Sequence, residues 1–140
     1  MNIQNPLRCI LLWLILILTM ILHFNYHVGE MFYGIDVVRP DSNGSIPLGT
    51  HLIRNVFYHL PILWIIILIY KDSKSIRMGL FTVSIIYTLA HVMHLIGELT
   101  RPDLSQMPLL TITLAVSILL NIEQYKYWKA FSSKNQKIYK

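Results

Sequence analysis

Cysteine and charged residues are both scarce in this sequence of 140 residues. Cys9 is the only cysteine, which excludes a disulfide within the chain and a metal cluster held by several thiolates of one chain. Charged residues make up 14% of the chain and hydrophobic residues 54%, a balance far from that of an ordinary soluble domain. The composition therefore favours a membrane protein, and the length favours a single domain covering residues 1–140.

Local motifs of soluble enzymes are missing as well. The sequence contains no phosphate-cradling glycine loop, no Gly-x-Ser-x-Gly and no Cys–His nucleophile pattern, so it assigns no catalytic residue. A leader cleavage site would need small residues after the first apolar run, which is instead followed by His23, Phe24 and Asn25. We therefore expect the first helix to be retained, and whether the protein is an enzyme stays open at this level.

Four apolar runs are the main feature that the sequence does have. With their polar ends included, the first three reach the roughly 20 residues that a helix needs to cross the hydrocarbon core, and the fourth is shorter. We predict an all-α integral membrane protein with four transmembrane helices in an up-down bundle, and a kink at Pro61 near His59. The expected helices cover about residues 7–30, 51–70, 78–98 and 107–124, followed by a polar basic tail at 125–140.

The net charge of +5 is distributed as in membrane proteins and gives no support to a nucleic-acid partner. Lys71, Lys74 and Arg77 lie between the second and third helices, and five further lysines lie in the tail. The other two connections, 30–50 and 98–107, are net acidic. By the positive-inside rule we expect both termini and the basic connection in the cytoplasm, the acidic connections outside, and insertion into a bacterial inner membrane.

One polar signature occurs twice, each time at the end of an apolar segment. The first copy reads HxxxHVGE from His23 to Glu30, and the second reads HxxHxxGE from His91 to Glu98. Each copy is followed by an Arg-Pro-Asp triplet, for which turn chemistry is favoured over direct ligand contact. When the copies are aligned on Gly-Glu, His23 and His91 fall in register. The sequence therefore predicts two pseudo-repeated helical hairpins that run in the same direction across the membrane.

The histidines and glutamates of both copies are the candidate ligands of a metal site. On an ideal helix the members of each copy share one face, the first copy within about 60° of arc. Lipid cannot solvate these faces, so we expect them to turn toward each other or toward a partner. Imidazole and carboxylate groups together suit transition-metal ions. The predicted metal-site residues are His23, His27, Glu30, His59, His91, His94 and Glu98.

Three interpretations of this constellation compete. The side chains form a buried polar network that holds the helices in register, or bind a transition-metal ion or haem, or line a path for protons or a small solute. Our leading hypothesis is a His/Glu-lined site for a metal ion or haem in the outer half, with His23 and His91 facing each other. The alternative is a non-enzymatic membrane subunit or assembly factor whose polar faces bind a partner helix or a second copy. The lipid bilayer is the partner that every interpretation requires.

Overall fold

The computed structural model describes residues 4–38, 42–100 and 106–136, and within these ranges it contains helices and no strand. Both Arg-Pro-Asp triplets, at 39–41 and 101–103, lie outside the described residues. One element, Glu30–Tyr33 (η1), is a 3-10 helix, and another, Asn55–His59 (η2), is a π-helix. In chain order the elements are α1 (Gln4–Gly29), η1 (Glu30–Tyr33), α2 (Leu48–Arg54), η2 (Asn55–His59), α3 (Leu60–Tyr70), α4 (Lys74–Leu99) and α5 (Met107–Gln136).

These elements form four helices that are long and apolar enough to cross a membrane, which confirms that part of the prediction. α2, η2 and α3 together make the second of them, Leu48–Tyr70, which we call the second span. α4 begins at Lys74, so Lys74 and Arg77 belong to this helix and not to the connection before it. α5 continues to Gln136, beyond the expected end at residue 124. The membrane-length segments are Pro6–Tyr33, Leu48–Tyr70, Lys74–Leu99 and Met107–Phe131.

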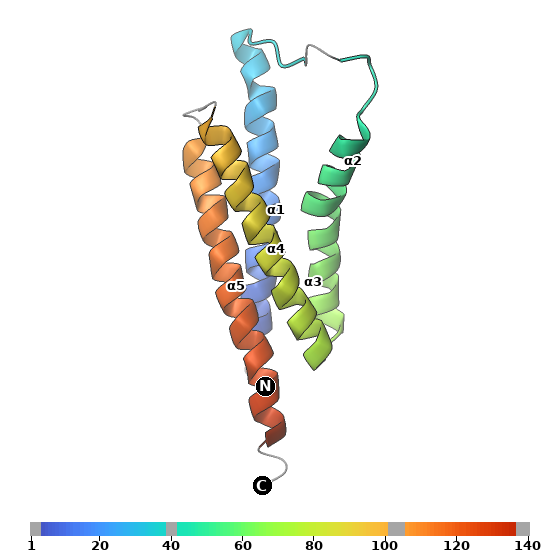
Figure 1. Cartoon of the computed structure of the whole chain (residues 1–140), viewed down its shortest axis with the longest axis vertical. Helices are drawn as coiled ribbons and strands as arrows, with labels where there is room; N and C mark the ends of the chain where they lie inside the picture. The colour runs from blue at the N-terminus through green and yellow to red at the C-terminus, as the bar shows by residue number, and fades with distance from the viewer. Residues whose placement is uncertain (1–3, 39–41, 101–105, 137–140) are drawn as a thin grey trace.

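α1, α4 and α5 form the closely packed part of the molecule (Figure 1). α5 packs against both α4 and α1, and α3 packs against α1, whereas α2 diverges from the other helices (Figure 1). The start of α1, the end of α5 and the connection between α3 and α4 lie toward one end of the molecule, and η1 and the last turn of α4 lie toward the other (Figure 1). We call the second of these the histidine end, because both Gly-Glu pairs lie there.

Five buried residues of α1 are spaced alternately four and three residues apart, and this seam ends at a histidine. Its members are Cys9, Trp13, Leu16, Met20 and His23. α4 has a similar seam, made of Arg77, Leu80, Ser84, Tyr87 and His91. Such spacing keeps one face of each helix against its neighbours, as in a coiled coil. The register of the two helices therefore buries His23 and His91.

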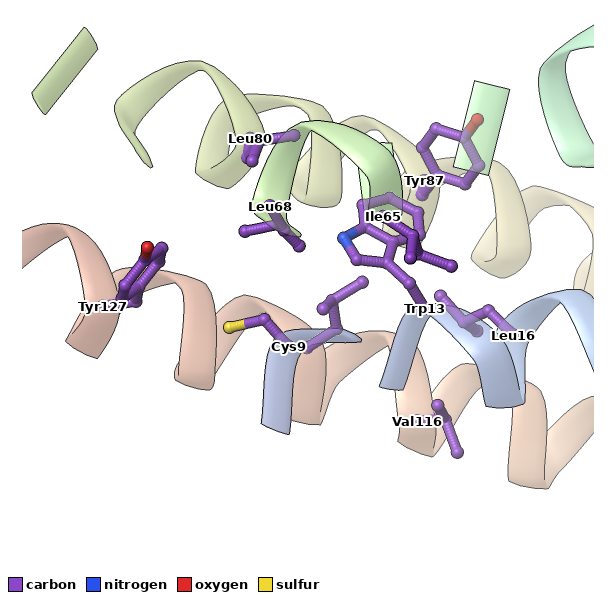
Figure 2. Packing of buried hydrophobic residues seen from close by; sticks show 10 residues of the cluster. Cys9, Trp13, Leu16, Ile65, Leu68, Leu80, Tyr87, Val116 and Tyr127 are labelled. Carbon is purple, nitrogen blue, oxygen red and sulfur yellow. The ribbon is translucent and has the colours of Figure 1, made fainter. Parts of the chain in front are cut away.

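Trp13 fixes the position of α1 relative to its neighbours. Figure 2 shows its indole among Ile65 and Leu68 of α3 and Tyr87 of α4. The rings of Trp13 and Tyr87 meet edge to face, with their centroids 5.0 Å apart. Aromatic pairs in this arrangement add to the stabilisation that comes from burial. The contact therefore helps to set the depth at which the histidines of α1 and α4 meet.

The π-helical turn η2 ends two residues before Pro61, close to the kink that the sequence predicts. In this turn the N–H of Leu60 donates to the carbonyl of Asn55, five residues back. The next bond of this kind would come from residue 61, and because proline has no N–H, the carbonyl of Val56 loses that donor. The hydroxyl of Tyr87 on α4 donates to this carbonyl instead. Pro61 thus leaves an acceptor on the second span that α4 satisfies.

Arg77, away from the histidine end, joins α4 to α5. Its guanidinium group donates to the two carboxylate oxygens of Asp72 at 2.6 and 2.7 Å and to the carbonyl of Tyr127 at 2.6 Å. It also lies 3.8 Å from the centroid of the Tyr127 ring. A buried charge is tolerated only where such partners surround it. These contacts with Tyr127 explain why α5 stays packed beyond residue 124.

Candidate metal centre

His23 and His27 of α1 and Glu98 of α4 bring their ligand atoms together at the histidine end. One nitrogen of each histidine and one carboxylate oxygen all lie within 4.8 Å of one another. Two helices that are far apart in the sequence therefore build the group, and each contributes residues that the sequence predicted as ligands. Two imidazoles and one carboxylate are a donor set found in mononuclear zinc and iron sites.

The two histidines of α1 differ in exposure, although they lie one turn apart on the same face. His23 continues the buried seam and is 7% exposed, whereas the side chain of His27 is 44% exposed. Their rings meet edge to face with centroids 4.8 Å apart. Beyond His27 lies a hollow lined by Phe24, His27, Val28, Glu30 and Val37. The group is thus closed on the side of His23 and accessible on the side of His27.

α4 presents His94 and Glu98 to this group from the opposite side. The ring of His94 meets that of His23 edge to face, with centroids 4.7 Å apart. Its Nε2 lies 3.6 Å from a carboxylate oxygen of Glu98, one turn further along α4. Glu98 therefore lies close to histidines of both helices, and its side chain is 25% exposed. The carboxylate is positioned to accept hydrogen bonds from either helix or to bind an ion held by α1.

Gln106, just before α5, also contacts this group, and the sequence analysis did not single it out. Its amide Nε2 lies 3.1 Å from Nδ1 of His27. Gln106 is fully buried, and it begins a seam of α5 that continues through Leu110 and Thr113. That spacing is the signal in the sequence that could have identified it. Glu30 approaches the same Nδ1 atom of His27 from η1, at 3.9 Å.

Four predicted ligands lie outside the three-residue group. His94 and Glu30 lie beside it, whereas His91 and His59 make other contacts. His91 is buried one turn below His94, and its ring lies 5.6 Å from that of Phe57 in η2. The ring contacts that the structure gives for His23 are with His27 and His94. His59 is exposed, and its Nδ1 lies 2.7 Å from Oδ1 of Asn55 on its own helix.

The fold and the site together define a helical protein with four helices of membrane-spanning length and a His/Glu cluster toward one end. No family model, curated protein or solved structure matches this chain. The chemistry of the cluster is therefore the strongest guide to function.

Proposed function

We propose that this is a small polytopic membrane protein that binds one divalent transition-metal ion through His23, His27 and Glu98. The observation that supports the proposal best is the convergence of three ligand atoms from two helices within 4.8 Å. Three protein ligands leave at least one coordination position open for water or a further donor. We place His94 and Glu30 around the ion as hydrogen-bonding or proton-accepting groups. We further propose that the four helices form an up-down bundle of two pseudo-repeated hairpins.

Gln106 supports the proposal as the group that orients His27. A metal-bound histidine almost always donates its other ring N–H to a nearby acceptor. The oxygen and nitrogen of a glutamine amide are assigned from their surroundings, so a half-turn of the Gln106 amide would place Oε1 where Nε2 now lies. That oxygen would accept from Nδ1–H of His27 and leave Nε2 of the ring for the ion.

Contacts between the imidazole rings favour a bare metal ion over haem. The two axial imidazoles of a haem iron lie on opposite faces of a flat macrocycle and cannot touch each other. The ring of His23 is in edge contact with His27 at 4.8 Å and with His94 at 4.7 Å. Neither pair leaves space for a porphyrin between its rings, so we propose a mononuclear ion.

Metal titration of the purified protein tests this function. We expect detergent-solubilised protein, stripped with a chelator, to bind one equivalent of zinc or cobalt, and cobalt to develop visible absorption bands of a nitrogen- and oxygen-liganded ion. The double variant His23→Ala/His27→Ala should lose this binding. The matched control His51→Ala/His59→Ala removes two imidazoles from the second span and should keep it. Equal binding by both variants, or none by the unaltered protein, would reject the proposed site.

We further propose that the histidine end faces outward and both termini face the cytoplasm, on the basis of the charge distribution. Asn43→Cys and Lys74→Cys place a thiol on an exposed residue at opposite ends of the molecule. The native Cys9 is fully buried and should contribute little background. In whole cells, a membrane-impermeant reagent should label position 43 and leave position 74 unlabelled until the membrane is opened. The reverse pattern would invert the topology.

A second candidate function, as a subunit that binds a partner helix, is favoured by the second span. Of the four spans it is the least buried within the chain. His51, Arg54 and Asn55 are all exposed on it. Co-purification of a stoichiometric membrane partner without any bound metal would favour this candidate over the metal site.

A further inference from the structure

A hollow between α1 and the second span takes no part in the metal centre. α1 contributes one aromatic ring to its wall, and the other lining residues come from α2 and η2. The ribbon of α2 diverges from the bundle in this region (Figure 1). The hydroxyl of Tyr58 donates to the carbonyl of Met20 on α1 at 3.4 Å, which joins the two walls at this level. The lining residues are Phe24, Thr50, Ile53, Arg54, Tyr58 and His59.

The lining of this hollow is cationic and hydrogen-bonding on one part and apolar on another. Arg54 contributes a guanidinium group, and within the part of the chain that the structure describes no carboxylate forms an ion pair with it. The ring of His59 is held through Nδ1 by Asn55, so Nε2 is directed away from that contact. Phe24 and Ile53 supply exposed apolar surface. A ligand matching these walls has an anionic head and a hydrocarbon part.

The position of Arg54 along the second span indicates the same kind of ligand. Arg54 lies six residues after Leu48, which begins the span, so it is about 9 Å along the helix. The whole span of 23 residues is about 34 Å long and exceeds a hydrocarbon core of about 30 Å. The guanidinium group is therefore near the boundary between acyl chains and headgroups, where a long cationic side chain reaches toward lipid phosphates. An unpaired charge any deeper would be costly.

We propose that this hollow binds the phosphate headgroup of an anionic phospholipid. Arg54 forms paired, charge-assisted hydrogen bonds with two phosphate oxygens. Thr50 and His59 contribute single hydrogen bonds, and an acyl chain follows the surface of Phe24 and Ile53. The site is independent of the metal ion, because none of its residues belongs to the group formed by His23, His27 and Glu98.

Native mass spectrometry of the purified full-length protein tests this inference. Titration with phosphatidylglycerol in a non-ionic detergent should give one retained lipid per chain, and phosphatidylcholine should bind about tenfold more weakly, since its headgroup carries no net negative charge. Arg54→Gln should weaken phosphatidylglycerol binding about tenfold. Lys71→Gln, which removes an exposed charge at the far end of α3, should leave binding unchanged.

Five outcomes would overturn the inference. Equal binding of both lipids, or equal effects of Arg54→Gln and Lys71→Gln, would mean that the headgroup is not recognised. Full displacement by millimolar inorganic phosphate would assign the site to free phosphate instead of lipid. A stable dimer that excludes lipid and dissociates in Arg54→Gln would assign the surface to a second copy. If circular dichroism shows that Arg54→Gln is unfolded, Arg54→Lys replaces it, and unchanged affinity of that variant would exclude the paired bonds.

Discussion

The two copies of the histidine signature, on α1 and on α4, lie at the same end of the molecule and have different surroundings. Both histidines of the α1 copy contribute to the three-residue group, whereas from α4 only Glu98 enters it, with His94 alongside. His91 packs against Phe57 of η2 instead. Similar residues at similar spacing are therefore not equivalent once the helices are packed.

Neighbouring elements account for the difference. The second span passes beside α4 at η2, where it supplies Phe57 and receives the hydroxyl of Tyr87. This surface covers His91, while His23 faces the last turns of α4. The two glutamates differ for a simpler reason. Glu98 lies within α4, whereas Glu30 begins the 3-10 turn η1 after α1 has ended.

Replacing one histidine of each copy should give the largest difference in metal affinity between the two copies. His23→Ala should reduce metal affinity by more than about 100-fold, beyond the range expected for residues that only support a ligand. His91→Ala should leave the affinity nearly unchanged and lower the melting temperature, because it empties space against Phe57. Isothermal titration and thermal unfolding of both variants measure the two effects. Equal losses of affinity would instead mean that the copies form one symmetric site.

The glutamates provide a second, smaller contrast. Glu98→Gln should weaken metal binding by about 10–100-fold, since the amide oxygen remains a ligand but loses its charge. Glu30→Gln removes the same charge from the other copy and should weaken binding less than Glu98→Gln does, because the contact that the structure gives for the Glu30 carboxylate is its 3.9 Å approach to His27. Competition with a metal-sensitive dye measures both variants. Were Glu30→Gln the more damaging change, the ligand assignment of the carboxylates would have to be exchanged.

Replacing Tyr87 tests how much the contact between α4 and η2 contributes to stability, separately from metal binding. Tyr87→Phe leaves the carbonyl of Val56 without its side-chain donor and should lower the free energy of unfolding by about 1–3 kcal/mol, with metal affinity retained. Tyr125→Phe is the matched control, because Tyr125 is exposed on α5. Chemical unfolding in detergent compares the two. A loss of metal binding in Tyr87→Phe would show that the contact with η2 also positions the site.

Much of the candidate site could be predicted from the histidines and carboxylates within apolar helices, because such groups would be costly in lipid and are expected to face protein. His23, His27 and Glu98 were all among the predicted ligands, and the structure brings them together. Gln106 was missed because a single amide is not a typical metal ligand, although its spacing from Leu110 and Thr113 places it on the buried face of α5. The environment of His91 could not be predicted from the sequence either, since it depends on Phe57, a residue with no polar signal of its own.

The order of residues along the chain was sufficient to determine that this protein is helical and that four of its helices are long and apolar enough to cross a membrane. It also determined which helix faces are polar and are therefore expected to pack against protein. Periodicity and apolar length are local properties, so these conclusions needed no knowledge of neighbours. Only the tertiary structure decided that Glu98 and not Glu30 joins the two histidines of α1, and that Tyr87 supplies the hydrogen bond that Pro61 removes. These choices depend on which helices lie side by side, and that is set by packing between segments far apart in the sequence.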